Sequence, residues 1–220
     1  MGESSLHESI KLAYSRPGDL LEEQVGEYVI DIIRRNLLIE IQTANFSSIK
    51  TKLKTLVEDH KVRLVHPISK MKWIVRTDTD GETELSRRKS PKKGRLEDLF
   101  NELVYLPDLM SHTNFSIELL YISSEDVLIN DGKGSWRRKY WSIHDRRLLE
   151  IAEGTVFCEP RDFLKLLPAS LPKPFTTRDL SQIKKLPIRL TRKMAYCLRL
   201  MNVIKIVGRN KGSNLYEITR

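Results

Sequence analysis

The feature that most constrains the fold is a pair of short apolar runs, residues 28–33 and 37–43, separated by only three residues. Both runs are rich in Ile, Leu and Val, which favour β-strands. Arg35 and Asn36 between them can form a two-residue turn. In that register, residues whose numbers sum to 71 lie opposite each other. The sequence therefore predicts an antiparallel hairpin in the N-terminal part of the chain.

Two acidic residues interrupt the aliphatic pattern of this hairpin. Because strand side chains alternate between faces, Glu40 and Gln42 share one face. The same register places Asp31 opposite Glu40, with Cβ atoms about 5 Å apart. Facing carboxylates repel each other, and a divalent cation between them reverses that effect; Mg²⁺ (or Mn²⁺) prefers such oxygen ligands. The alternative is that each acid is a polar residue on a solvated strand face.

Helices and strands are predicted on both sides of the hairpin. The apolar spacing predicts helices over residues 5–15 and 46–60, and a short helical stretch over residues 20–25. Two further strands are expected at residues 62–68 and 72–76.

This order of elements, with acids on two adjacent strands, resembles the core of the PD-(D/E)XK nuclease superfamily, which has the restriction-endonuclease-like fold. The resemblance covers about residues 5–76. It implies a Mg²⁺-dependent phosphodiesterase that acts on DNA or, less often, on RNA. Asp31 and Glu40 would be the two metal ligands, and the Ile41 carbonyl would complete the site.

Two positions bear on how closely the chain follows that pattern. Glu8 matches an acid that many members of the superfamily have on the first helix. Gln42 stands where the superfamily usually has Lys, and Gln offers hydrogen bonds to an attacking water without a positive charge. Some active restriction enzymes resemble this chain in having Gln there, so both a catalytic and an inactive site are consistent with the sequence.

Charge is distributed unevenly along the chain. Residues 172–220 contain twelve Lys or Arg and two acids, a net charge of +10, whereas the whole chain has a net charge of +9. Residues 1–171 are therefore close to neutral. A 49-residue segment with this charge is typical of a module that binds phosphates.

The same basic segment has the element order of a DNA-binding module. Two predicted helices after Phe175 are followed by strands at residues 203–207 and 215–219, joined by a basic turn that contains glycine. This order resembles a winged helix-turn-helix, which implies a helix in the major groove and a wing on the backbone. The alternative is that the winged helix mediates protein contacts. The expected DNA-contacting residues are Arg189, Arg192, Lys193, Arg199, Arg209 and Lys211.

The middle of the chain carries two further basic clusters. We expect residues 77–95 to form an exposed loop, because they are polar and contain Gly81, Pro91 and Gly94. Its candidate nucleic-acid-binding residues are Arg87, Arg88, Lys89, Lys92 and Lys93; a solvated loop is the alternative. An additional hairpin is expected over residues 115–141, and its Trp136 and Trp141 stand beside cations, in positions suited either to base stacking or to core packing.

Together these patterns predict an α/β protein: a restriction-endonuclease-like mixed sheet flanked by helices, followed by a small C-terminal winged-helix domain. The expected boundaries are residues 1–160 for the nuclease-like domain, 161–174 for a linker and 175–220 for the winged helix. The expected function is a Mg²⁺-dependent DNA endonuclease in repair, recombination or restriction. The alternative is a non-catalytic DNA-binding regulator, or a subunit of a larger assembly with a helicase or methyltransferase. Cutting both strands would require a homodimer.

Composition excludes several other classes of protein. No apolar run approaches the ~18 residues that span a bilayer. Residues 1–5 lack the pattern of a secretory signal, and the two cysteines form no CxxC pair. The histidines lack zinc-like spacing, and no P-loop motif is present. We therefore expect an intracellular, cytoplasmic protein in a reducing compartment, with no membrane partner and no ATPase site.

Overall fold

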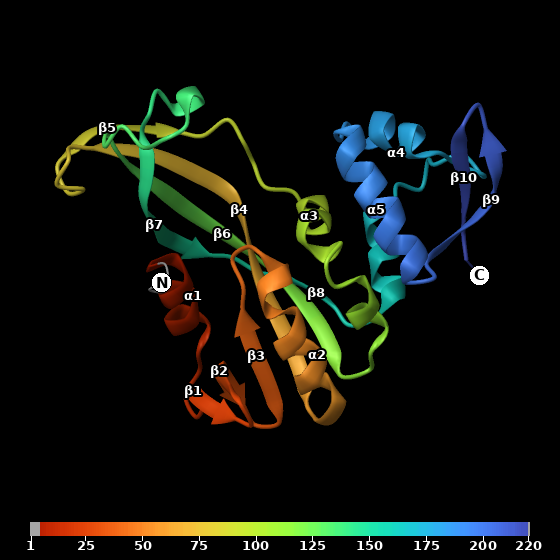
Figure 1. The fold of residues 1–220 in the computed structure, drawn as a ribbon, viewed down its shortest axis with the longest axis horizontal. Coiled ribbons are helices and arrows are strands. Elements are labelled where there is room, and N and C mark those ends of the chain that lie inside the picture. Colours follow the sequence, from red (N-terminus) through yellow and green to blue (C-terminus); the bar gives the residue numbers. More distant parts are fainter. Residues whose placement is uncertain (1–4, 220) are drawn as a thin grey trace.

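The computed structural model describes residues 5–219 and contains an eight-stranded mixed sheet with helices on both faces (Figure 1). The strand order is β1-β2-β3-β4-β6-β7, with β5 paired to β4 and β8 paired to β6. The predicted α/β class with a mixed sheet flanked by helices is confirmed. Within the described residues, every helix is too short or too polar to cross a bilayer. Residues 1–4 lie outside this range, so most of the segment considered for a secretory signal is not among the described residues.

The N-terminal elements follow the predicted order with one exception. They are α1 (Ser5–Tyr14), β1 (Leu20–Val25), β2 (Tyr28–Arg34), β3 (Leu37–Ile41), a 3₁₀ turn (Phe46–Ile49) and α2 (Lys50–Asp59). The predicted helical stretch at 20–25 is wrong, because these residues form strand β1 against β2. Every residue of β1 is exposed or half-buried, so its sequence lacks the alternation of apolar and polar residues that indicates a strand.

The predicted register of the hairpin is confirmed. Ile32 pairs with Ile39, Ile33 with Leu38 and Arg34 with Leu37, and each pair sums to 71. Arg35 adopts the left-handed conformation (φ 56°) that the tight turn requires. Strand β3 then pairs in parallel with β4 after the α2 crossover.

Two long strands carry the sheet beyond its body. Strands β4 (Lys61–Thr77) and β6 (Phe115–Ile129) pair in parallel over most of their lengths. Their second halves form an arm with β5 (Glu84–Lys89) and β7 (Ser142–Ile151), at the left of Figure 1. We use "the arm" for residues 71–89 and 123–150.

The arm corrects three predictions. Residues 77–95 are not a loop throughout, because residues 84–89 form β5. The strands predicted at 62–68 and 72–76 are one strand, and the hairpin predicted over 115–141 is formed by β6 and β7, so it extends to residue 151. In each case pairing with a neighbouring strand overrides a local sequence that is polar or interrupted.

Two hydrophobic clusters, one on each face of the sheet, hold the layers together. On one face, Leu6 and Ile10 of α1 pack against Ile32, Ile39 and Ile41. The other face packs against α2, whose buried residues are Leu53, Leu56 and Val57. This second cluster continues through the short elements at Leu96–Leu103 and Pro107–Ser111 into the C-terminal region.

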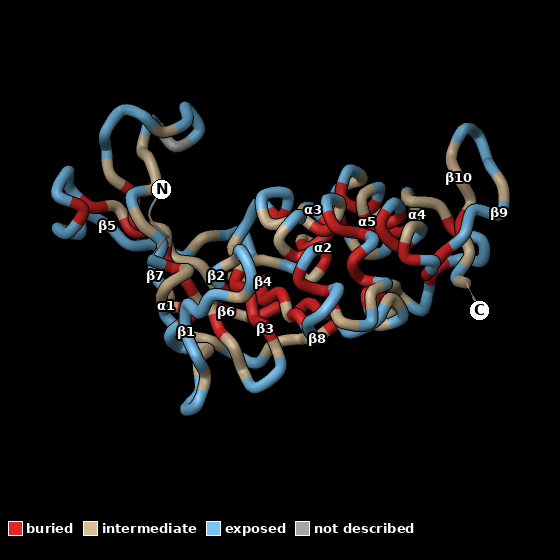
Figure 2. Tube along the Cα trace, turned by 60° about the horizontal axis from the view of Figure 1, so that its bottom comes forward, coloured by how far each residue is buried: buried red, intermediate tan, exposed pale blue. Residues whose placement is uncertain are grey.

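The C-terminal region contains the predicted helix pair and hairpin. After β8 (Thr155–Phe157) and a 3₁₀ segment (Pro160–Leu166), it comprises α4 (Thr177–Lys184), α5 (Ile188–Leu200), β9 (Ile204–Asn210) and β10 (Ser213–Ile218). Thr176 and Asp179 form a capping box at the start of α4. Phe163 and Leu166 are buried in the shared cluster, so the predicted linker at 161–174 packs into the core. The hairpin lies at the opposite end of an elongated molecule from the arm (Figure 2).

Candidate active site between strands β2 and β3

The ladder between β2 and β3 opens where the two acidic residues lie. Its last backbone pair joins Ile32 to Ile39. One residue further along each strand, the Asp31 carboxylate takes the place of a backbone acceptor: its Oδ2 accepts the Ile41 N–H at 2.7 Å. The predicted Asp31–Glu40 neighbourhood is therefore present, but a side chain bridges the strands there instead of a backbone pair.

The Ile41 carbonyl faces the same opening. Successive residues of a strand direct their N–H and C=O groups to opposite neighbours. The Gln42 N–H donates to the Val65 carbonyl on β4 at 2.9 Å. The backbone groups of Ile41 therefore point the other way, towards β2, where the ladder has ended. This placement fits the predicted role of the carbonyl as a third oxygen donor.

Glu40 is buried next to a lysine from the following helix. Only 5% of Glu40 is exposed, and Lys52 Nζ on α2 lies 2.6 Å from its Oε1. Burial, followed by the negative charge of Asp31, raises the Glu40 pKa to about 7, although Lys52 opposes the shift. Near neutral pH, Glu40 is therefore divided between its protonated and ionised forms.

Asp31 titrates in the opposite direction. Burial opposes its ionisation, but hydrogen bonds from His7 and from the Ile41 N–H outweigh burial, and the Asp31 pKa lies below its usual range. His7 Nε2 on α1 lies 3.3 Å from Asp31 Oδ2. One shared environment thus shifts the two pKa values in opposite directions, a pattern that is common at functional sites.

The donor set fits a hard divalent cation that keeps several ligands from solvent or substrate. Mg²⁺ is commonly held by one or two carboxylates, together with waters and phosphate oxygens. Asp31, Glu40 and the Ile41 carbonyl would supply those oxygens, and a cation would offset the burial and the Asp31 charge that together raise the Glu40 pKa. Among the described residues, no group of three or more His, Cys, Asp or Glu side chains could hold a metal ion. A site at this position must therefore be completed by backbone, water or substrate.

Glu8 and Gln42 have contacts other than those predicted. Glu8 Oε2 pairs with Lys11 Nζ at 2.6 Å, whereas its neighbour His7 is the α1 residue that contacts Asp31. The Gln42 side-chain amide donates to the Ala44 carbonyl, in the turn that follows β3. The Gln42 carbonyl pairs with His66 Nδ1 at 2.7 Å. The roles predicted for Glu8 as a catalytic acid and for Gln42 in orienting water remain predictions.

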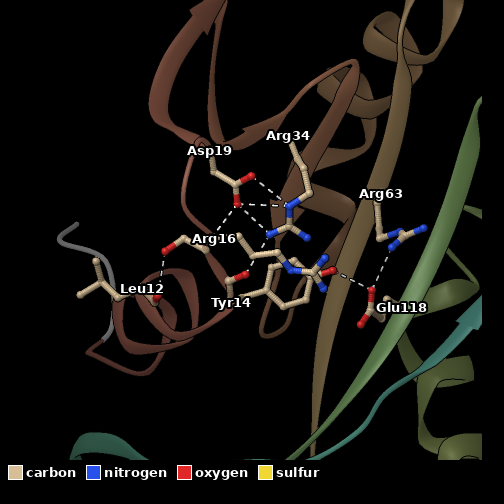
Figure 3. Close-up of polar contacts among 8 residues, drawn as sticks. Leu12, Tyr14, Arg16, Asp19, Arg34, Arg63 and Glu118 are labelled. Carbon is tan, nitrogen blue, oxygen red and sulfur yellow. Dashed lines mark hydrogen bonds and ion pairs between the residues drawn. The ribbon is translucent and has the colours of Figure 1, made fainter.

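A polar network at the far end of α1 fixes this helix on the sheet (Figure 3). The Tyr14 hydroxyl donates to Glu118 Oε2 on β6 at 2.7 Å, and Arg63 NH1 on β4 lies 3.3 Å from the same oxygen. Arg34 on β2 pairs with Asp19 at 2.7 Å and donates to the Tyr14 carbonyl at 2.9 Å. By anchoring the C-terminal end of α1 to three strands, the network positions its N-terminal half beside the two acids.

The basic residues predicted in the middle of the chain are exposed on the arm or directly after it. Arg87, Arg88 and Lys89 lie on β5, and Lys92 and Lys93 follow it. Arg87 NH2 lies 3.0 Å from Glu125 Oε2, so this cation is already paired within the arm.

The basic residues of the C-terminal region are mostly exposed. Arg189, Arg192 and Arg199 are exposed on α5, and Arg209 and Lys211 are exposed at the β9–β10 turn. Lys193 is half-buried, and its Nζ donates to Asn101 Oδ1 at 3.0 Å, so this residue joins α5 to the short helix α3 (Phe100–Leu103). The C-terminal region also borders a cavity of about 610 Å³ near Leu167, Phe175 and Tyr216, and neither Asp31 nor Glu40 lines this cavity.

Two residues of the site were not assigned to it from the sequence. Lys52 is one of several cations that spread around α2, and neither Lys52 nor His7 stands out in the sequence. Lys52 directly precedes the buried Leu53, and His7 directly follows the buried Leu6. This spacing places each side chain at the border of a packed helix face, which is the available sequence signal.

Comparisons with known proteins identify relatives without assigning an activity. The family model described as a domain of unknown function (DUF8091) matches residues 4–158. A protein of Treponema pallidum (strain Nichols), described as uncharacterized, is 33% identical over 181 residues, which is 82% of this chain and 72% of that protein. No solved structure matches.

Proposed function

This chain belongs to the DUF8091 family, a domain of unknown function, and we propose that it is a divalent-metal-dependent endonuclease that acts on DNA. The observation that carries the proposal is the opening of the β2–β3 ladder at Asp31 and Glu40. Two acids with oppositely shifted pKa values meet there, beside the Ile41 carbonyl.

The order of elements supports a restriction-endonuclease-like core. A helix, three antiparallel strands, a crossover helix and a parallel strand follow in sequence. The acids lie on the second and third of these strands, adjacent in the sheet. This agrees with the resemblance to the PD-(D/E)XK superfamily that the sequence motif suggested.

Asp31, Glu40 and the Ile41 carbonyl would hold Mg²⁺ or Mn²⁺. When bound, the ion supplies electrostatic stabilisation to a phosphodiester under attack by water. In that reaction water adds to phosphorus, one P–O bond breaks, and the departing oxygen leaves as a hydroxyl. The chain's own contribution is to hold the carboxylates in place: Ile41 N–H and His7 orient Asp31, and Lys52 orients Glu40.

Lys52 supplies the positive charge that Gln42 lacks. Its ammonium group lies 2.6 Å from Glu40 Oε1 and is 18% exposed, so it borders the site without being sealed off from it. A fixed cation near a phosphodiester stabilises the negative charge that develops during attack. We therefore assign to Lys52 the electrostatic role that the superfamily's usual lysine plays.

The C-terminal region would hold the DNA. Two helices followed by a hairpin support the winged-helix assignment. Arg192, Arg199 and Arg209 are exposed on this unit, and the net charge of +10 between residues 172 and 220 favours a polyanionic partner.

Cleavage of plasmid, linear and branched DNA with Mg²⁺, Mn²⁺ or EDTA tests the proposal. We expect wild-type protein to cut only with a divalent ion, and Asp31→Asn and Glu40→Gln to abolish cutting while DNA binding persists. Glu23→Gln is the matched control, because Glu23 is an exposed acid on the neighbouring strand β1. Cutting by Asp31→Asn at the wild-type rate would refute the assignment.

A second candidate is a DNA-binding protein without nuclease activity. It is favoured by the Gln42 side chain, which is neutral and engaged with the turn after β3. This candidate predicts salt-sensitive binding and no cutting with either metal. A helicase or methyltransferase partner, or a homodimer, remains a prediction under both candidates.

A further inference from the structure

The loop between β6 and β7, residues 130–141, presents two aromatic side chains to solvent. We call this loop the arm tip; Figure 2 shows that it projects from the body of the protein. Trp136 is 72% exposed and Tyr140 is 57% exposed. Large aromatic side chains normally bury most of their surface, so two of them exposed on one short loop indicate a surface that a partner covers.

The backbone of the arm tip is closed by hydrogen bonds and strained at two residues. Gly134 N–H donates to the Tyr140 carbonyl at 2.9 Å, and Tyr140 N–H donates to the Ser135 carbonyl at 3.1 Å. Tyr140 has φ 67° and Lys139 before it has φ 51°. A bulky residue rarely adopts this left-handed conformation, and such strain concentrates at functional sites.

The charge of the arm tip identifies the kind of partner. Residues 130–141 contain four Lys or Arg and one Asp. The Arg137 guanidinium lies 5.5 Å from the centre of the Trp136 ring, so a cation accompanies the exposed aromatic surface. Arg76 on β4 lies 4.9 Å from the Trp141 ring and anchors the base of the loop to the arm. Exposed rings flanked by cations suit a strand that offers both base faces and phosphates.

We infer that the arm tip binds unpaired nucleic-acid bases, with Trp136 and Tyr140 stacking on bases while neighbouring cations contact phosphates. The inference deepens the proposed function by naming its substrate class, DNA with single-stranded or unpaired segments, and rests on it for the identity of the ligand as nucleic acid. Base faces inside a duplex are already stacked, so only unpaired bases offer the surface that these two rings need.

Binding of fluorescent oligonucleotides to the full chain in EDTA tests the inference without any cutting. The probes are a 12-residue oligo-dT, an abasic strand of equal length and charge, and a hairpin duplex. We expect wild-type protein to bind oligo-dT more tightly than the abasic strand. Trp136→Ala should weaken oligo-dT binding about tenfold and leave the abasic strand unaffected. Tyr105→Ala is the matched control, because Tyr105 is 46% exposed elsewhere.

Tyr140→Gly separates binding from folding. Glycine adopts a positive φ at no steric cost, so this variant should unfold no earlier than wild type and yet bind oligo-dT several-fold more weakly. Equal binding of oligo-dT and the abasic strand by wild type would overturn the inference, as would wild-type affinity in Trp136→Ala. Trp136-dependent binding to anionic phospholipid vesicles, with no preference for bases, would overturn it in favour of a membrane surface.

The two proposals fail in different assays. Loss of base-dependent binding in Trp136→Ala, together with no cutting by wild type in Mg²⁺, would leave the arm tip as inferred and reject the nuclease. Metal-dependent cutting by wild type, together with equal binding of oligo-dT and the abasic strand, would support the nuclease and reject the arm-tip inference.

Discussion

Replacing Glu40 with Gln should stabilise the protein at alkaline pH and leave it nearly unchanged at pH 4.5. In the folded protein the Glu40 pKa is about 7, against an ordinary value of 4.5, because the carboxyl is buried beside Asp31. The unfolded chain therefore releases the proton near pH 4.5, while the folded chain keeps it until about pH 7. Between these values the wild type loses stability as pH rises. Gln mimics the protonated carboxyl and has no proton to release, so the variant escapes this loss.

The size of the effect follows from the pKa difference. A shift of one pKa unit corresponds to about 1.4 kcal/mol, so a rise from 4.5 to about 7 corresponds to about 3 kcal/mol at pH 8. For a chain of this length, about 3 kcal/mol corresponds to roughly 6–12 °C in Tm. Since Glu40 is only 5% exposed, solvent screening reduces this figure little.

Urea unfolding of wild type and Glu40→Gln at pH 4.5, 6 and 8, in EDTA, measures the difference directly. The variant's advantage should grow from near zero to about 3 kcal/mol across this range, and Glu23→Gln should show no such trend. Adding Mg²⁺ at pH 8 should then stabilise wild type but not Glu40→Gln, because an ion that binds only the folded state adds stability. A variant as stable as, or less stable than, wild type at pH 8 would refute the account of a strained acid pair.

Three further predictions concern the surroundings of the site and the DNA surface. Lys52→Met should lower cleavage by about 100-fold, within the range for loss of one electrostatic donor, whereas Lys54→Met, on an exposed position of the same helix, should cut normally in the plasmid assay. Tyr14→Phe should cost about 1–2 kcal/mol in urea unfolding, because it removes the hydrogen bond to the Glu118 carboxylate, and Tyr105→Phe should cost nothing measurable. Arg192→Ala with Arg199→Ala should lower the slope of log K against log salt for duplex DNA by about 2, while Lys61→Ala should leave it unchanged; an unaltered slope in the double variant would remove α5 from the DNA surface.

The sequence predicted those parts of the fold in which local pattern and tertiary environment agree. The β2–β3 register followed from the aliphatic runs and the two-residue turn between them, and α2 followed from Leu53, Leu56 and Val57 at helical spacing. Strands β1 and β5 could not be predicted, because nearly all their residues are exposed and only pairing with a neighbour makes them strands.

The sequence predicted the two acids of the candidate site but not the helix residues that contact them. Asp31 and Glu40 lie on adjacent strands, so their proximity follows from register alone. His7 and Lys52 reach the acids from two helices on opposite faces of the sheet, and sequence spacing within a helix says nothing about where that helix crosses a strand. His7 and Glu8 illustrate this limit. Adjacent residues of a helix differ by about 100° in direction, so His7 contacts Asp31 whereas Glu8 pairs with Lys11.

The uneven distribution of charge along the chain is consistent with the proposal that the acid pair and the basic C-terminal region act together. Residues 1–171 are close to neutral overall, so outside its local basic clusters this part of the chain contributes little attraction for a polyanion. Two ionised acids would repel an approaching phosphate, but burial and the charge of Asp31 favour the protonated form of Glu40, and Lys52 pairs with its ionised form. A cation held by Asp31, Glu40 and the Ile41 carbonyl would favour the ionised form of Glu40 and would supply positive charge for a phosphate. Metal affinity should accordingly rise with pH up to about 7 and level off above it. DNA recruitment, which we propose depends on the C-terminal cations, should stay nearly constant over the same range.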